Sequence, residues 1–236
     1  MWIHQGFLFV KEINQRLDVT ALSNLSTKPK IDEISIELLR QYYERDLEPY
    51  IFIFELDNGI VVNLDFNKEH LCHLLGIEKM AKGTVRYKEL YKYSGLAGYN
   101  NIQNGTITIQ HLKALNKGRF NFIKDKLIFF YLLPFIVDSP EILLDFVTSN
   151  GKSLIEAKLL AYMTTEEAYV HLGIDEDDDS NRFFPKTYLI ERINETSDGT
   201  KFIKGKSPFK VIKAQKVSRI SNDINSMSGP DAESIS

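Results

Sequence analysis

The chain has 236 residues, of which 43% are hydrophobic and 26% are charged. This composition is typical of a globular protein with one main domain, and it excludes a wholly disordered chain. The single cysteine excludes an intrachain disulfide framework and is typical of a reducing compartment.

The N-terminal part of the chain predicts neither secretion nor a membrane anchor. Residues 7–10 form a short apolar patch without a basic leader or a small-residue cleavage site. The longest apolar run, Leu127 to Val137, is about half a membrane span and contains Pro134. We therefore expect a cytoplasmic protein, in which residues 1–47 form a mainly helical N-terminal extension.

A β-hairpin is predicted directly after this extension. Residues 50–56 and 60–66 are rich in β-branched and aromatic residues, and Asp57-Asn58-Gly59 joins them. The Asn-Gly step is the strongest short hairpin signal, because both residues accept the positive φ that the tightest turns require.

The stretch 66–79 follows the hairpin and holds two of the five histidines and the only cysteine. Its leucines recur at helical spacing up to Gly76, so His70 and His73 would share one face and offer an imidazole pair for proton transfer. For His70, a solvated or capping role is the favoured alternative. For His73 the alternatives stay open, although we expect it to point inward with the leucines. Cys72 is predicted to be a buried, inert thiol.

No metal or cofactor is predicted. A metal site needs at least three ligands, and neither an HExxH pair nor paired CxxC motifs occur in the chain. The acidic run 175–179 lacks the alternating ligands and central glycine of a calcium loop, and a solvated hairpin tip is the favoured interpretation.

The remainder of the chain predicts helices first and strands afterwards. A helix is expected from about Ile109, and a second from Phe120 to Phe130 with one buried face. From Glu141 onward the period approaches two, which indicates a sheet. The candidate strands are residues 143–148, 154–163, 168–173, 183–192 and 209–216.

The predicted fold class is α+β. N-terminal helices and a β-hairpin are followed by a mostly antiparallel C-terminal sheet of four to five strands packed on helices. The predicted domains are a helical extension (1–47), an α+β domain (48–219) and a disordered tail (220–236), which has few apolar residues.

Charge is distributed unevenly along the chain. Residues 182–219 contain ten Lys and Arg against three acids, which gives +7, so the remainder must sum to −10 for the net charge of −3. Such asymmetry indicates a basic surface for a polyanion, usually a nucleic acid. A solvated hairpin whose lysines guard an edge strand explains the count equally well.

The order of these elements resembles the barnase/EndoU/colicin/RelE class of RNases, and within it the fourth phage-associated subgroup. The resemblance covers roughly residues 48–216. The residues that carry it are Phe66, Lys68, Glu69, His73-Leu74-Leu75-Gly76, Ile102, Asn104-Gly105, Ile107, Leu112, Phe122-Ile123-Lys124-Asp125-Lys126, Phe184-Pro185-Lys186-Thr187-Tyr188 and Glu191-Arg192. Lys126 departs from an arginine that is common there, which puts a phosphate contact at that position in doubt.

The resemblance implies a phage or mobile-element RNase or toxin that cleaves RNA without a metal, through attack of the ribose 2′-OH on the adjacent phosphorus. An antitoxin or a host protein is a possible further partner. We expect His73 to act as base or acid, Thr187 to donate a hydrogen bond to phosphate, and Lys186, Arg192 or Lys213 to supply positive charge. The residues expected to bind substrate are Lys68, His171, Lys210 and Lys213.

Two alternatives accompany these assignments. Strand parity places Thr187 on the face opposite Lys186 and Arg192, so not all three can serve one site, and Thr187 is also an ordinary strand former. The competing function is a non-catalytic defence or counter-defence factor that binds a nucleic acid or a host protein through the same basic sheet. The net acidity of the chain slightly favours this second function.

Overall fold

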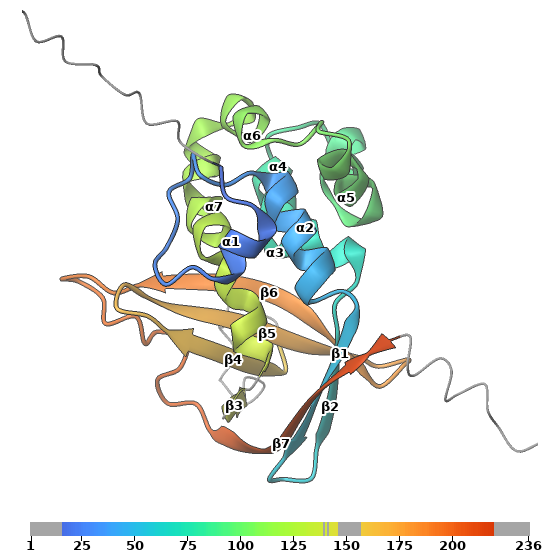
Figure 1. Ribbon diagram of the computed structural model, residues 1–236, viewed down its shortest axis with the longest axis vertical. Coiled ribbons are helices and arrows are strands. Elements are labelled where there is room, and N and C mark those ends of the chain that lie inside the picture. The colour runs from blue at the N-terminus through green and yellow to red at the C-terminus, as the bar shows by residue number, and fades with distance from the viewer. Residues whose placement is uncertain (1–15, 139, 141, 146–156, 220–236) are drawn as a thin grey trace, which may run out of the picture.

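The structure places a group of helices at one end of the molecule and a barrel of strands at the other (Figure 1). It is a computed structural model, and it describes residues 16–138, 140, 142–145 and 157–219. The predictions for residues 1–15 and for the tail 220–236 lie outside the described residues. No helix in the described ranges has the length and apolar character needed to cross a membrane.

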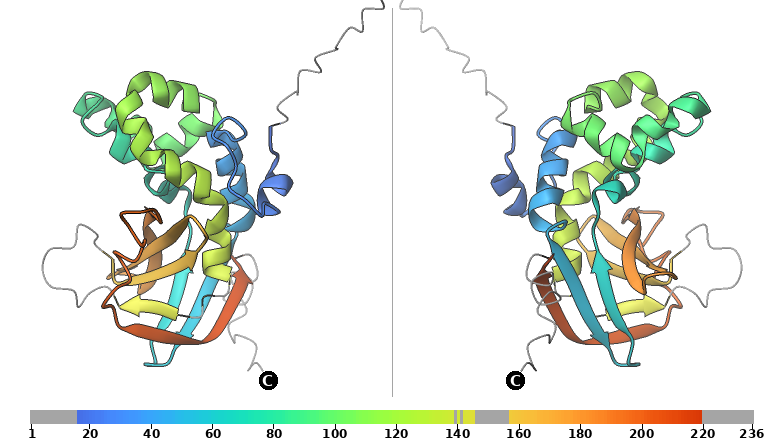
Figure 2. Two further views of the ribbon diagram at one scale, coloured as in Figure 1. Left: turned by 90° about the vertical axis from the view of Figure 1, so that its left-hand side faces the viewer. Right: turned by 90° about the vertical axis from the view of Figure 1, so that its right-hand side faces the viewer.

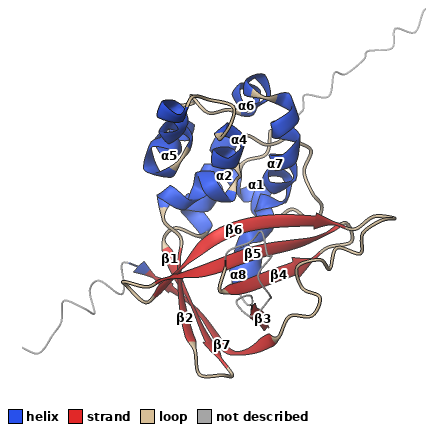
Figure 3. Cartoon of the chain, turned by 180° about the vertical axis from the view of Figure 1, so that it is seen from behind, coloured by secondary structure: helices blue, strands red, loops and turns tan. Residues whose placement is uncertain are grey.

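The helices gather on one side of the barrel (Figure 3). Thr108 accepts a hydrogen bond from the His111 N–H at 3.0 Å and so caps α6, which confirms the predicted start at Ile109. The α-helices are α1 (Val19–Ser23), α2 (Ile36–Asp46), α3 (Leu71–Leu74), α4 (Ile77–Ala81), α5 (Gly95–Gln103), α6 (Ile109–Leu115), α7 (Lys117–Phe129) and α8 (Leu133–Asp138). The 3₁₀ helices are η1 (Lys68–His70), η2 (Tyr87–Tyr93) and η3 (Phe130–Leu132).

The described strands form a closed barrel in the order β1-β2-β6-β5-β4-β3-β7. Neighbouring strands are antiparallel except β2 and β6, which run parallel and are in register at Leu64 and Phe183. The strands are β1 (Tyr50–Leu56), β2 (Val61–Asp65), β3 (Ile142–Asp145), β4 (Leu159–Thr164), β5 (Ala168–Asp177), β6 (Arg182–Arg192) and β7 (Pro208–Ser218).

The predicted mostly antiparallel C-terminal sheet of four to five strands packed on helices is therefore wrong, because all seven described strands close into one barrel. The hairpin belongs to the same sheet, because β7 pairs with β1 from Tyr50 to Leu56 and β6 pairs with β2. A free hairpin and a free C-terminal sheet would each expose unpaired backbone N–H and C=O groups at their edges, and closure into a barrel pairs them.

Two local predictions are confirmed. The hairpin turns at Asn58-Gly59, where Gly59 has a φ of 86° and the Leu56 N–H donates to the Ile60 carbonyl at 2.9 Å. The predicted apolar face of the helix from Phe120 onward is buried in α7 and its continuation, with at most 4% of any side chain exposed at Phe120, Ile123, Leu127 and Phe130. Local sequence was sufficient for both.

Helices and barrel share one hydrophobic core. The described part of the N-terminal extension joins it, since Leu22 in α1 and Leu39 in α2 are fully buried in the same cluster as Phe52 of β1. Figure 2 shows α7 running from the helical end down to the barrel. There the Tyr188 hydroxyl of β6 donates to the Phe129 carbonyl at 2.7 Å. This contact fixes the face of β6 that meets α7.

Candidate functional site

A cavity of about 460 Å³ lies between α4, α7 and β6, where the helices meet the barrel. Its lining combines positively charged side chains with an apolar floor. We call it the cationic cavity, and its lining residues are Gly76, Lys79, Met80, Arg119, Phe122, Ile123, Asp125, Lys126, Leu189 and Ile190.

Gly76 allows α4 to approach α7 closely enough to form this cavity. It links α3 to α4 with a φ of 76°, which lies in the left-handed region that favours glycine. A Cβ at this position would lie 2.8 Å from Ile123 Cγ2 and 3.2 Å from Lys126 Cδ. Any larger residue would therefore push the corner away from α7 as well as strain the backbone.

Lys126 lines the cavity and has no acidic ion-pair partner among the described residues. Burial lowers its pKa to about 8, and the nearby positive charge of Lys79 acts in the same direction. Neither lysine forms an ion pair within the described residues. A pair of cations placed in this way is stabilised by a bound anion, because the anion supplies the missing opposite charge.

Arg119 adds a third cation at the rim. Its Nη1 donates to the Lys82 carbonyl at 2.6 Å and more weakly to the Lys79 carbonyl at 3.4 Å, so it holds the end of α4. These partners are neutral carbonyl groups. The positive charge of Arg119 therefore adds to that of the two lysines.

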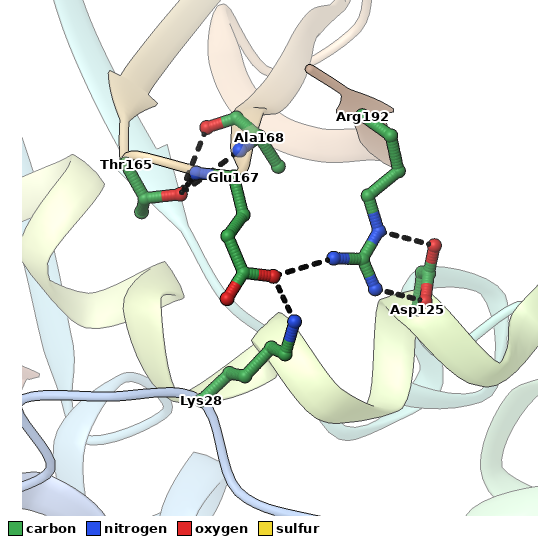
Figure 4. A network of polar contacts seen from close by, with 6 residues as sticks. All are labelled: Lys28, Asp125, Thr165, Glu167, Ala168 and Arg192. Carbon is green, nitrogen blue, oxygen red and sulfur yellow. Dashed lines mark hydrogen bonds and ion pairs between the residues drawn. The ribbon is translucent and has the colours of Figure 1, made fainter. Parts of the chain in front are cut away.

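Asp125 is the acidic residue of the cavity lining, and Arg192 binds its carboxylate (Figure 4). Arg192 Nε and Nη2 donate to the two carboxylate oxygens of Asp125 at 2.9 and 2.7 Å, and Nη1 donates to Glu167 at 3.0 Å. Lys28 pairs with the same Glu167, and the guanidinium lies 4.7 Å from the centre of the Phe129 ring. The carboxylate of Asp125 is thus already neutralised.

The turn that carries Glu167 is held by Thr165. The Thr165 hydroxyl oxygen accepts hydrogen bonds from the backbone N–H groups of Ala168 at 3.1 Å and Glu167 at 3.3 Å (Figure 4). This network ties the end of β6, the loop that contains Lys28 and helix α7 together beside the cavity.

His73 lies on α3 beside this corner and is exposed, so the expectation that it points inward is wrong. Its Nδ1 is 3.4 Å from Glu78 Oε2, and its carbonyl accepts the Gly76 N–H at 2.9 Å. The leucines on either side take the buried positions, which leaves His73 on the opposite face of the short helix.

His70 is the more enclosed of the two histidines. Its Nδ1 accepts a hydrogen bond from the Asn67 N–H at 3.1 Å, and its ring stacks on Phe184 at 5.7 Å. Burial is the main cause that lowers its pKa. These contacts match the capping alternative. Cys72 is buried, as predicted, and burial raises the pKa of its thiol to about 12.

Thr187 and Lys186, the other predicted site residues of β6, make their contacts away from the cavity. Thr187 lies against Gly173 of β5, where a Cβ on the glycine would be 2.7 Å from Thr187 Cγ2. Lys186 pairs with Asp175 at 3.3 Å. The next residue in the strand, Tyr188, faces α7, so Thr187 faces away from the helices.

The residues predicted to bind substrate are also spread over the molecule. His171 is fully buried with Tyr162, Tyr169 and Phe202 around it, and burial lowers its pKa to about 4. Its ring nitrogens make no hydrogen bond within the described residues, and the nearby Leu189 backbone offsets only part of the effect of burial.

The three predicted substrate lysines lie apart from His171 and from the cavity lining. Lys68 lies 5.6 Å from the centre of the Tyr99 ring, Lys210 is exposed, and Lys213 pairs with Glu55 at 2.9 Å. The structure does not bring these four residues together with His73. Arg192 reaches the cavity through Asp125.

Sequence reasoning missed Lys79 and Arg119, and it named Lys126 only as a doubtful phosphate contact. The two missed cations are exposed positions on short helices, and single cations there have the pattern of a solvated face. Gly76, which follows the leucines, was the signal available in the sequence, because a glycine often marks a corner where two elements approach closely.

Comparison with known proteins gives one match. The model of a family described as phage-Barnase-EndoU-ColicinE5/D-RelE like nuclease4 matches residues 39–226. A search of curated proteins and a search of solved structures both found no match. Within the described residues, no group of three or more His, Cys, Asp or Glu side chains is placed to hold a metal ion.

Proposed function

The chain belongs to the family of phage-Barnase-EndoU-ColicinE5/D-RelE-like nucleases, and from this membership we propose that it cleaves RNA at a phosphate bound in the cationic cavity. The observation that carries the proposal is Lys126, a half-buried cation that has another cation beside it and no ion-pair partner among the described residues. A phosphodiester supplies the single negative charge that such a site lacks.

The cavity suits the transition state better than the ground state. When the ribose 2′-oxygen attacks phosphorus, negative charge grows on the nonbridging phosphate oxygens. Lys126, Lys79 and Arg119 surround the place where this charge would develop, within a partly apolar wall that strengthens their effect. Their contribution is electrostatic stabilisation of that charge.

The proton transfers are assigned to His73. The 2′-oxygen forms a bond to phosphorus, the bond from phosphorus to the 5′-oxygen breaks, and the products are a 2′,3′-cyclic phosphate and a free 5′-hydroxyl. His73 takes the 2′-OH proton while water protonates the leaving oxygen, or it protonates the leaving oxygen while water takes the 2′-OH proton. It is accessible from solvent on the corner next to Gly76, and Glu78 beside it orients the ring. RNA carries its own nucleophile, so the proposed reaction includes no metal ion.

The test uses a single-stranded RNA and two modified copies of it. The protein, with a chelator present, should cleave the RNA to cyclic phosphate ends and should leave the 2′-deoxy and 2′-O-methyl copies intact. Cleavage of the deoxy copy, or cleavage that stops with the chelator, would contradict the proposed mechanism.

A non-catalytic role is the second candidate, because Arg192 is held by two acids and is not free to meet a phosphate. Binding of a nucleic acid or a host protein without cleavage would support that role. Tight binding of the 2′-O-methyl copy together with no cleavage of the RNA in the same preparation is the result that separates the two functions.

A further inference from the structure

Two tyrosines of η2, which contacts α4, are far more exposed than large aromatic residues usually are. Tyr87 and Tyr91 both lie in η2, with 93% and 61% of their surface exposed. Neither ring contacts another aromatic ring or a cation within the described residues. Such rings carry a large apolar surface that a bound partner can cover.

The helix that presents these rings is firmly anchored. Tyr93, its last residue, is buried, stacks on His111 at 5.9 Å, and its hydroxyl lies 3.0 Å from His111 Nε2. Contacts with α4 and α5 hold η2 on two further sides. The exposed tyrosines therefore stand on a fixed platform.

Cations alternate with these rings. Residues 82–92 include Lys82, Arg86, Lys88 and Lys92 against the single acid Glu89. Glu89 accepts hydrogen bonds from Arg86 Nη2 at 3.1 Å and Nε at 3.2 Å, and it lies 3.9 Å from the Lys92 ammonium. Lys82 and Lys88 are exposed and have no ion pair among the described residues. The segment keeps a positive surplus around its rings.

This segment is continuous with the cationic cavity. Arg119, which lines the cavity, donates to the Lys82 carbonyl at 2.6 Å, and a Cβ at Gly83 would lie 3.0 Å from Arg119 Nη2. Phe122 in the cavity lining adds another ring with 85% of its surface exposed. Exposed rings and cations thus extend from the cavity to η2.

We propose that Tyr87 and Tyr91 form a base-stacking subsite for single-stranded RNA that leads into the cationic cavity. Rings spaced between cations match a strand in which flat bases alternate with phosphates, and base stacking on tyrosine is largely independent of sequence. A duplex hides its base faces, so it cannot use these rings. The position of the subsite beside the cleaved phosphate rests on the proposed function, whereas the stacking itself does not.

The experiment measures binding of a fluorescein-labelled 2′-O-methyl oligouridylate, which the proposed reaction cannot cleave, by fluorescence anisotropy. The double variant Tyr87→Ala/Tyr91→Ala should lose roughly tenfold or more in affinity for this single strand. It should bind a 2′-O-methyl duplex as the unaltered protein does. The matched control Tyr87→Phe/Tyr91→Phe keeps the ring faces and should keep the affinity. Both rings are exposed, so folding should be preserved, as a thermal melt will verify.

Two results would overturn the subsite. The first is unchanged single-strand affinity of the alanine variant, and the second is an equal loss in the phenylalanine variant. If the protein dimerises and the alanine variant is monomeric without loss of RNA affinity, the rings belong to an interface between copies, which also overturns it. RNA cleavage is scored separately. Tyrosine-dependent binding without cleavage refutes the proposed function alone, and cleavage with tyrosine-independent binding refutes the subsite alone.

Discussion

Cationic side chains gather in two regions of this molecule, the C-terminal part 182–219 and the helical face around the cationic cavity. In the C-terminal part, acids from other segments form ion pairs with most of the cations. These pairs are Arg182 and Arg219 with Asp65, Lys186 with Asp175, Arg192 with Asp125 and Glu167, Lys213 with Glu55, and Lys216 with Asp138.

On the helical face the opposite holds. Lys79, Lys82 and Lys126 have no ion pair within the described residues. The surplus of +7 counted along 182–219 is therefore partly offset by acids of other segments, although Lys201, Lys204 and Lys210 have no ion pair within the described residues. At the cavity, by contrast, the positive charge of the lysines is not offset in this way. A charge count along the chain does not give the electrostatic potential at the surface, because the fold determines which charges form ion pairs.

The largest effect on RNA cleavage is expected from replacement of His73, and replacement of a barrel residue should have none. Replacing His73 with Ala should lower the RNA cleavage rate by about 10² to 10⁴, the usual contribution of a general acid or base. His70→Ala is the matched control in the neighbouring turn and should retain activity if it folds. Thr187→Val, on the face of β6 turned away from the helices, should also leave the rate unchanged. Steady-state cleavage of a labelled RNA measures all three, and a silent His73→Ala would remove the assignment.

A somewhat smaller effect is expected from the cavity lysine. Lys126→Met keeps the length of the side chain and removes the charge, so cleavage should fall by about 10² to 10³, as for loss of one oxyanion donor. Lys117→Met changes an exposed lysine of the same helix and should not alter the rate. Equal effects of the two variants would mean that α7 contributes only general positive charge.

Salt dependence compares the two regions directly. Lys79→Met should reduce the slope of log affinity against log salt by about 0.7 for a single strand, because one phosphate contact is lost. Lys213→Met should change it little, since its partner Glu55 already neutralises that charge. The slopes follow from anisotropy titrations at several salt concentrations. A larger change for Lys213→Met would return the binding surface to the C-terminal strands.

The smallest effect is expected in the pH dependence of RNA affinity. Lys126 is charged below its pKa of about 8 and neutral above it, so affinity for the 2′-O-methyl strand should fall as pH rises through about 8. A bound phosphate raises this pKa, which moves the fall upward at high ligand concentration. Lys126→Arg stays charged and should show no fall in this range. A profile that is the same in both proteins would rule out titration of Lys126.

Sequence was sufficient where the structure depends on neighbouring residues. The Asn58-Gly59 turn and the buried face of α7 are encoded within one turn and one helix. Alternation along β7 predicts which residues share a face, but it does not indicate that β7 pairs with β1 across most of the chain. The parallel contact between β2 and β6 is equally nonlocal.

The candidate site was the harder part for the same reason. Lys79 and Lys126 lie on different helices and meet only because Gly76 turns α4 against α7. Likewise, nothing in the neighbourhood of Arg182 indicates that Asp65 will neutralise it. The family resemblance named both Lys126 and Gly76, and the fold explains their joint role through one close contact.

The most direct test of the account is the pKa of Lys126 itself, measured by NMR on protein with labelled lysines and assigned with Lys126→Met. Lys126 should have a pKa of about 8 in the free protein, and this pKa should rise when the 2′-O-methyl strand is added, since the phosphate favours the charged form. A pKa close to the ordinary lysine value of 10.5, unchanged by the strand, would contradict the claim that this cavity binds phosphate.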